Sequence, residues 1–156
     1  MENKTCCFTG HRNLPAEKLN EIKYELERII LLLAGKGYNR FIAGGALGFD
    51  TIAAETVLRL MEKEPELKLE IAVPCPGQHM RFSPEQKKQY LRILESADKV
   101  FMVSDRYSRY CMAKRNKYMV DNSDCVVAYL NRPKGGTFNT VSYAEHSGKE
   151  VIYLLR

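Results

Sequence analysis

Apolar and polar residues follow two distinct patterns along the chain. Short apolar runs, several of them ending at glycine or proline, are typical of buried strands in a parallel sheet. Longer segments in which apolar residues recur every three or four positions are typical of amphipathic helices. The clearest of these runs from Pro15 to about Ala34, because proline suits a first helical turn and Gly35 suits the exit.

These patterns predict strands and helices in alternation. The strands are expected at 5–9, 40–43, 68–73, 98–103, 124–130 and 150–154. The helices are expected at 15–34, 48–64, 84–96, 112–122 and 137–147. Strands separated by helices form a parallel sheet that is covered on both faces. The sequence therefore predicts the α/β class: a single Rossmann-like domain over residues 1–156 with a mostly parallel sheet of about six strands.

The composition fits one folded domain and weakly favours an anionic partner. The 156 residues are 45% hydrophobic and 28% charged, which is an ordinary balance for a globular protein with its own core. The formal net charge of +5 is modest for a dedicated nucleic-acid binder. Anion binding therefore depends on where the charges lie.

Cysteine and histidine spacing predicts neither a metal site nor a disulfide framework. The five cysteines form no CxxC pair and the three histidines form no HxxxH pair. Cys6 and Cys7 are adjacent in a strand, so their side chains are expected on opposite faces of the sheet. No apolar stretch has the length of a signal-peptide core or a membrane span. We therefore expect a cytoplasmic protein without a membrane segment.

Three loops at the carboxyl ends of strands carry the candidate chemistry. In parallel α/β sheets, ligands bind at this edge, where the strand order reverses. The first loop reads Thr9, Gly10, His11 and Arg12. Its glycine lets the backbone approach a ligand closely, and its arginine suits a phosphate. A tight turn with a surface arginine is the alternative interpretation.

The second loop spans residues 44–50 and contains Gly44, Gly45 and Gly48. Glycine-rich loops that open a helix aim backbone N–H groups at an anion, and the helix dipole adds to this attraction. Close packing of the helix on the strand is the alternative explanation for these glycines. Asp50 is expected to cap the helix, because a carboxylate would repel a phosphate.

The third loop precedes the last helix and contains Gly135, Gly136, Thr137 and Thr140. Glycines beside hydroxyl groups suit phosphate oxygens, whereas a turn with a threonine cap would give the same sequence. Three such loops at one edge indicate a phosphate site more strongly than any one of them.

Residues 106–118 interleave five basic residues with three tyrosines. Basic and aromatic side chains together can hold single-stranded nucleic acid by charge and stacking. The favoured interpretation is a solvated helix with tyrosines packed beneath it.

Catalytic groupings are weak in this sequence. Cys75 and His79 follow the third strand and would form a nucleophilic pair if their side chains met, but a buried thiol and a surface histidine are favoured. Glu145 lies on the helix after the third loop and is a weak candidate for a general base.

Four segments together resemble the YpsA-like branch of the SLOG superfamily: CCFTGHR, AGGALGFD, RNKYMVDNSD and KGGTFNT. The resemblance extends over nearly the whole chain, and the four segments occur in the expected order. The resemblance implies a sensor or binder of nucleotide ligands, with ADP-ribose-like or NAD-derived molecules as the usual suggestion. It also relates the chain to the Lonely Guy phosphoribohydrolases, which release a base from a nucleoside monophosphate, and to DNA-processing proteins, which bind single-stranded DNA.

The hydrolases carry an Arg-Lys-x-x-Met motif, followed by Pro-Gly-Gly-x-Gly-Thr-x-x-Glu. Arg115 and Met119 match the first motif, so Arg115 is similar to an active-site arginine and is the best candidate for a buried ligand contact. In the second motif, Tyr143 takes the place of the catalytic glutamate, and Glu145 points elsewhere on a helix. The resemblance therefore weighs against hydrolase activity, with Arg115 and Glu145 as weak catalytic candidates.

The sequence thus favours a protein that binds or senses a nucleotide-derived phosphate ligand. The predicted ligand contacts are Thr9, Gly10, His11, Arg12, Gly44, Gly45, Gly48, Arg115, Gly135, Gly136, Thr137 and Thr140. No cofactor is assigned beyond a nucleotide or ADP-ribose-like ligand, and no metal is expected. A phosphoribohydrolase-like enzyme and a module for single-stranded nucleic acid remain alternatives. By analogy with relatives, two copies are expected to pair.

Overall fold

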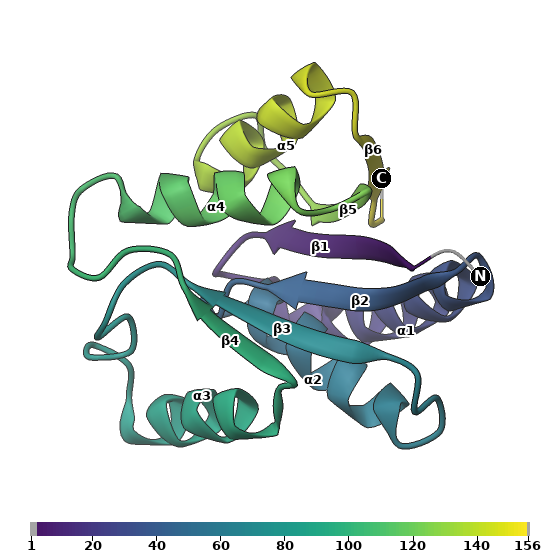
Figure 1. The fold of residues 1–156 in the computed structure, drawn as a ribbon, viewed down its shortest axis with the longest axis horizontal. Coiled ribbons are helices and arrows are strands. Elements are labelled where there is room, and N and C mark those ends of the chain that lie inside the picture. Colours follow the sequence, from purple (N-terminus) through teal and green to yellow (C-terminus); the bar gives the residue numbers. More distant parts are fainter. Residues whose placement is uncertain (1–2, 156) are drawn as a thin grey trace.

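A computed structural model describes residues 3–155 as a six-stranded parallel sheet with helices on both faces (Figure 1). The strands are β1 (Lys4–Gly10), β2 (Tyr38–Ala43), β3 (Lys68–Val73), β4 (Lys99–Met102), β5 (Cys125–Tyr129) and β6 (Glu150–Tyr153). The helices are α1 (Leu19–Gly35), α2 (Phe49–Met61), α3 (Pro84–Ser96), α4 (Cys111–Asp121) and α5 (Gly136–His146). The predicted Rossmann-like α/β fold is confirmed.

The strand order is β4-β3-β2-β1-β5-β6, and every neighbouring pair is parallel. The chain moves outward from β1 to β4 and then crosses to β5 on the other side of β1. The order therefore reverses between β1 and β5, where a parallel sheet leaves a crevice at its carboxyl edge. This edge lies on the left in Figure 1, in the direction of the arrowheads of β1 and β2.

Alternate strand residues pack against different helix layers. Cys6 and Phe8 belong to the core cluster that includes α1 and α2, whereas Cys7 belongs to the cluster that includes α4 and α5. Figure 1 shows α4 and α5 on one side of the sheet and α3 on the other. Cys6 and Cys7 therefore point to opposite faces, as predicted. All five cysteines are buried and free, and burial raises the pKa of the Cys7 thiol to about 12.

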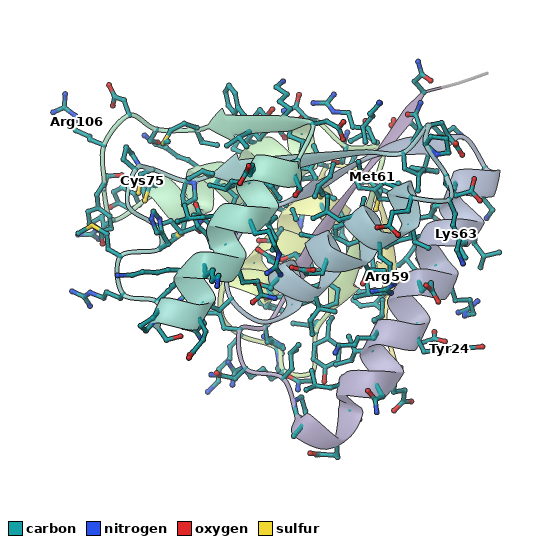
Figure 2. All side chains as sticks on the ribbon, turned by 90° about the horizontal axis from the view of Figure 1, so that it is seen from below. Tyr24, Arg59, Met61, Lys63, Cys75 and Arg106 are labelled. Atoms are coloured by element: carbon teal, nitrogen blue, oxygen red, sulfur yellow. The ribbon has the colours of Figure 1, made fainter. Side chains whose placement is uncertain are left out.

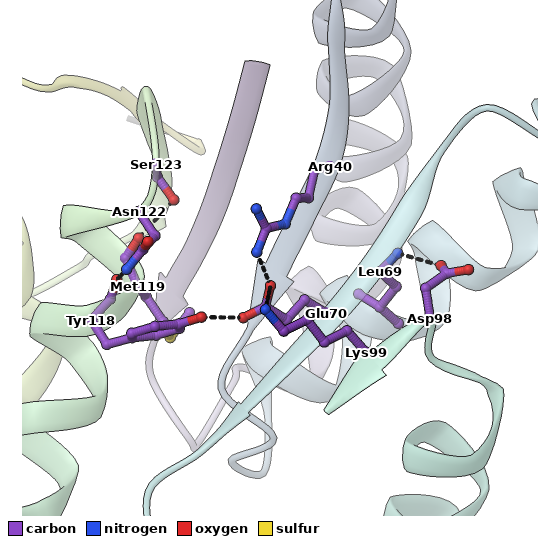
Figure 3. Close-up of polar contacts among 9 residues, drawn as sticks. All are labelled: Arg40, Leu69, Glu70, Asp98, Lys99, Tyr118, Met119, Asn122 and Ser123. Carbon is purple, nitrogen blue, oxygen red and sulfur yellow. Dashed lines mark hydrogen bonds and ion pairs between the residues drawn. The ribbon is translucent and has the colours of Figure 1, made fainter. Parts of the chain in front are cut away.

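A buried carboxylate links α4 to the sheet (Figure 3). Glu70 on β3 is 1% exposed, forms an ion pair with Arg40 and accepts a hydrogen bond of 2.7 Å from the Tyr118 hydroxyl. Burial and this hydrogen bond raise the pKa of Tyr118 to about 12. The Tyr118 ring also stacks on Phe101, with ring centroids 4.6 Å apart. Tyr118 is therefore packed beneath its helix, as the sequence predicted.

The largest difference from the predicted boundaries lies at the start of the first helix. Pro15 is extended, residues 16–18 form a 3-10 turn, and α1 begins only at Leu19. None of the residues in the 3-10 turn is buried, so no packing favours a regular α-helix there. No helix in the described part of the chain is long and apolar enough to cross a membrane.

Candidate phosphate-binding site

A cavity of about 350 Å³ opens between the loop after β1 and the start of α5. Because β1 and β5 are neighbours, this cavity lies where the strand order reverses. It brings together eight of the residues predicted from sequence: Thr9, Gly10, His11, Arg12, Arg115, Gly135, Gly136 and Thr137. The first and third loops and α4 thus meet at one site.

The other predicted contacts lie outside this lining: Gly44, Gly45, Gly48 and Thr140. Gly44 packs behind the cavity, where a Cβ would come within 2.6 Å of the Arg115 guanidinium. The Thr140 hydroxyl donates a hydrogen bond of 2.8 Å to the carbonyl oxygen of Gly136, one turn earlier in α5. Gly44 and Thr140 therefore pack around the cavity without lining it.

The first and second loops pack closely against each other, and this packing requires glycine at positions 10 and 48. A Cβ on Gly10 would overlap the ring of Phe49, and a Cβ on Gly48 would overlap the carbonyl of Arg12. The Phe49 N–H donates to the carbonyl oxygen of His11 over 3.2 Å. The start of α2 is therefore occupied by the β1 loop instead of being open to an anion.

The N-terminus of α5, in contrast, opens into the cavity. Gly135 precedes the helix with φ of +93°, and no side chain caps this end. Gly135, Gly136 and Thr137 all line the cavity. A Cβ on Gly136 would meet no described atom within 4 Å, and its φ is not in the left-handed region. Neither packing nor backbone geometry therefore requires glycine at position 136.

Two buried hydroxyl groups face the same space. Thr9 and Thr137 are 8% and 7% exposed, and both line the cavity. Within residues 3–155, neither side chain has a hydrogen-bonding partner. Buried hydroxyls are normally satisfied by protein, water or ligand, so these two groups are available to a bound molecule.

The charge of the lining is predominantly positive. Arg12, Arg132 and Lys134 lie at its exposed rim, and none forms an ion pair with a described residue. Asp50 is the lining's carboxylate. Arg132 and Lys134 were not predicted from sequence, although both stand within three residues of Gly135. Five uncharged lining residues were not predicted either: Phe8, Asn13, Ala46, Met112 and Asn116.

Arg115 forms the floor of the site. Its side chain is 4% exposed, and its Nη1 donates to the carbonyl oxygens of Gly44 and Ala72, the latter at 3.2 Å. Its Nε donates to Oδ1 of Asn116 over 2.9 Å. Burial lowers the pKa of this guanidinium. Arg115 therefore holds the second loop onto α4, in addition to lining the cavity.

Asp50 is a buried acid instead of the helix cap that we predicted. Gly48 is the N-cap of α2, and Asp50 lies two residues later in the first turn, where its Oδ2 accepts a hydrogen bond of 3.3 Å from the Ala46 N–H. Burial raises the pKa of Asp50 to about 6, and the nearby Arg115 partly offsets this shift. The carboxyl group thus has a different charge below and above this pH.

Asp50→Asn is expected to change how stability depends on pH. The folded pKa of about 6 lies above the unfolded value of 3.8, so protonation stabilises the wild type fully below pH 4 and is lost as pH rises through 6. Relative to wild type, the variant should gain about 3 kcal/mol of unfolding free energy between pH 4 and pH 8. Urea unfolding across this range measures the difference.

Asp105→Asn is the matched control, because that side chain is exposed on a loop. It should reproduce the wild-type pH profile. A constant difference between Asp50→Asn and wild type from pH 4 to pH 8 would contradict the raised pKa.

His11 joins the first loop to the end of β5. Its Nε2 accepts a hydrogen bond of 3.1 Å from the Asn131 N–H, which requires the other ring nitrogen to carry the proton in the neutral form. Burial, and then the charge of Arg132, lower the pKa of this imidazole. Near neutral pH, His11 is therefore uncharged and connects the first loop to the residues that follow β5 through this hydrogen bond.

The weak catalytic candidates do not meet in this cavity. Glu145 is exposed outside it and accepts a hydrogen bond of 3.0 Å from the Tyr153 hydroxyl. The Sγ of Cys75 lies 3.5 Å from Sγ of Cys111, and the His79 ring stacks on Tyr90. The structure thus brings neither Glu145 nor a Cys75–His79 pair to the site.

The segment before α4 carries exposed aromatic and basic side chains. Tyr107 is 74% exposed and Tyr110 is 58% exposed, and the guanidinium of Arg109 lies 4.9 Å from the Tyr110 ring centroid. Figure 2 shows Arg106 projecting from this loop at the edge of the molecule. The prediction that the tyrosines pack beneath the helix is therefore wrong for Tyr107 and Tyr110.

Comparison with known proteins places this chain in a family. The family model YpsA, described as the YspA SLOG family, matches residues 6–151. The chain belongs to the YpsA SLOG family. The resemblance to this branch of the superfamily, based on four sequence segments, is therefore confirmed.

Several relatives and solved structures share most of this chain. It is 36% identical over 126 residues to the SPbeta prophage-derived protein YoqJ of Bacillus subtilis, covering 73% of this chain and 74% of that protein. It is 31% identical over 118 residues to a UPF0398 protein of Halalkalibacterium halodurans, covering 74% of this chain and 62% of that protein. The chain thus spans less than two thirds of the second relative's length.

Two DNA processing proteins have a similar fold. DNA processing protein A of Helicobacter pylori, studied for its single-stranded DNA binding mode, superposes with a TM-score of 0.70 at 19% identity, covering 96% of this chain and 64% of that one. The homologous protein of Streptococcus pneumoniae gives a TM-score of 0.71 at 15% identity, covering 97% and 50%. At these identities, the likeness establishes the fold.

Proposed function

We propose that this YpsA-family protein binds a nucleotide-derived ligand by its phosphate, in the cavity between the β1 loop and the start of α5. The observation that carries the proposal is the open N-terminus of α5. Gly136 leaves space there that no described atom fills, and the hydroxyls of Thr9 and Thr137 face it without a partner among the described residues. This combination suits an anion that approaches the backbone closely.

Each group at the site has a distinct part in holding the phosphate. The N–H groups of the first turn of α5 donate to its oxygens, and the helix dipole favours the negative charge. The hydroxyls of Thr9 and Thr137 add further hydrogen bonds. Arg12, Arg132 and Lys134 supply charge-assisted contacts from the rim.

The ligand class that fits this proposal is a mononucleotide or an ADP-ribose-like or NAD-like molecule. Family membership and the cavity at the strand-order reversal both support a nucleotide over another anion. Binding or sensing is preferred to hydrolysis, because Glu145 lies outside the cavity. Pairing of two copies remains part of the proposal.

Thermal unfolding against a panel of phosphorylated ligands tests this function. The panel contains ADP-ribose, NAD, AMP, ATP, cyclic nucleotides and a short single-stranded DNA. A ligand at one hundred times its Kd adds about 2.7 kcal/mol to the native state, which raises Tm by roughly 5–10 °C at this chain length. A shift with at least one nucleotide is expected, whereas an unchanged Tm with every small ligand would contradict the proposal.

Binding of single-stranded nucleic acid is the second candidate function. The exposed Tyr107 and Tyr110 beside Arg106 and Arg109 offer stacking surfaces with adjacent positive charge. The fold likeness to the single-stranded DNA-binding protein of Helicobacter pylori supports the same candidate. This function predicts DNA binding that weakens steeply with salt and is lost in the double variant Tyr107→Ala/Tyr110→Ala. Absence of binding at low salt would remove it.

A further inference from the structure

A second hollow of about 440 Å³ lies between α4 and α5 and adjoins the phosphate cavity. Three residues line both spaces: Met112, Asn116 and Gly136. We call this hollow the α4–α5 groove and define it by Met112, Ala113, Asn116, Gly136, Asn139 and Tyr143. The two spaces therefore adjoin at these residues, and a molecule held by its phosphate at Gly136 has the groove directly beside it.

The walls of the groove suit a flat, weakly polar ring. Met112 and Ala113 contribute apolar surface from α4, and Tyr143 contributes an aromatic ring from α5. The Tyr143 hydroxyl donates a hydrogen bond of 2.6 Å to Oδ1 of Asp121, which fixes the orientation of the ring. Lys117 Nζ lies 5.4 Å from the centroid of this ring and pairs with Asp121 over 2.6 Å, so its charge is already matched.

Two side-chain amides, those of Asn116 and Asn139, can form hydrogen bonds with polar atoms at the edge of such a ring. Oδ1 of Asn116 accepts from Nε of Arg115, and its NH₂ group has no acceptor among residues 3–155. The Asn139 amide has no hydrogen-bonding partner in the part of the chain that the structure describes. Asparagine amides pair well with a ring nitrogen acceptor beside an exocyclic amino group, which is the pattern that adenine presents.

We infer that the α4–α5 groove binds the base of the nucleotide whose phosphate lies at the start of α5, and that it selects an adenine nucleoside 5′-phosphate. The inference rests on the proposed function, because the phosphate anchors the base in position. Met112, Ala113 and Tyr143 contact the ring faces, while Asn116 and Asn139 bind its polar edge. Tyr143, where the resembled hydrolases carry a glutamate, thus acts as a binding residue.

Isothermal titration with 5′-AMP, 5′-IMP and ribose 5-phosphate tests this inference. Wild type should bind AMP at least about tenfold more tightly than ribose 5-phosphate, because stacking and edge contacts add to the phosphate anchor. It should also prefer AMP to IMP, in which a carbonyl replaces the exocyclic amino group. Asn139→Leu should remove the preference for AMP over IMP.

A variant that fills the α4–α5 groove tests whether the additional affinity for AMP arises there. Ala113 is exposed, lines the groove and does not line the phosphate cavity, so Ala113→Trp should fill the groove in a folded protein. Its AMP affinity should fall to the level of ribose 5-phosphate, whose own affinity stays unchanged. Lys114→Trp, at the next exposed position of α4 and outside both spaces, should bind both ligands as wild type does.

The outcomes separate this inference from the function on which it rests. Equal affinity of wild type for AMP and ribose 5-phosphate would overturn the base subsite and leave the phosphate site standing. Binding of none of the three ligands would overturn the base subsite, and an unchanged Tm with the whole nucleotide panel would overturn the phosphate site as well. A change from dimer to monomer in Ala113→Trp, seen by size-exclusion chromatography, would show that a second copy covers the groove and would also overturn the base subsite.

Discussion

Gly48→Ala should destabilise the protein by at least about 3 kcal/mol. Gly48 has φ of +80° and ψ of −122°, a conformation that is nearly restricted to glycine. An added Cβ would also lie 2.5 Å from the carbonyl carbon of Arg12. Since the obstacle is backbone, relief requires the β1 loop and the start of α2 to move apart.

Urea unfolding of Gly48→Ala and Gly35→Ala measures this effect. Gly35 ends α1, has an ordinary φ and would meet no described atom within 4 Å on gaining a Cβ. Its variant should therefore be as stable as wild type or more stable by up to about 1 kcal/mol. Equal stability of the two variants would show that the loops are not packed as described.

Arg115→Met should cost about 3–5 kcal/mol at pH 8 and less at pH 5. Methionine keeps much of the side chain's volume but cannot donate to the carbonyl oxygens of Gly44 and Ala72, which remain buried. The nearby buried Asp50 also loses its main stabilising charge, so its pKa should rise further above 6. At low pH the carboxyl group is neutral, and this part of the cost disappears.

Lys114→Met is the control on the same helix, because Lys114 is exposed and should contribute less than about 0.5 kcal/mol. Urea unfolding at pH 5 and pH 8 gives both values for each variant. A loss below about 1 kcal/mol that does not depend on pH would contradict the structural role of Arg115. Truncation of Arg115, the buried ligand contact predicted from sequence, should therefore lower stability as well, because the contacts with Gly44 and Ala72 are lost.

The fold was predictable because its strands are short, apolar and separated by amphipathic segments. Helix ends were less predictable: Pro15 indicated a helix start, but the chain forms a 3-10 turn there because nothing packs against it. The location of the candidate site at the carboxyl edge of the sheet could be predicted from the parallel strand arrangement alone. The burial of Tyr118, in contrast to the exposure of Tyr107, depends on Glu70 and Phe101, which lie far away in sequence.

The roles of the glycines could not be separated by sequence. Gly48 and Gly136 both open helices after strands, and both fit an anion-binding loop. In the folded chain, Gly48 packs against the Arg12 carbonyl, whereas Gly136 faces open space. Likewise, Asp50 looked like a helix cap, but its position near Arg115, a residue of α4, depends on the tertiary structure and is not encoded in any local pattern.

Binding of AMP by Gly136→Ala tests whether the phosphate lies against the first turn of α5. The added methyl group meets no protein atom within 4 Å but enters the space proposed for the phosphate. Because alanine is the better helix former, the unfolding free energy should stay the same or rise by up to about 1 kcal/mol. A purely structural role for Gly136 would not combine unchanged stability with lost binding.

The measurement is the Kd for AMP of wild type, Gly136→Ala and the distant control Gly35→Ala, with urea unfolding of each. We expect at least about a tenfold weaker Kd for Gly136→Ala, which is 1.4 kcal/mol of binding free energy, and a wild-type Kd for Gly35→Ala. Wild-type affinity in Gly136→Ala would show that the phosphate does not lie against the first turn of α5.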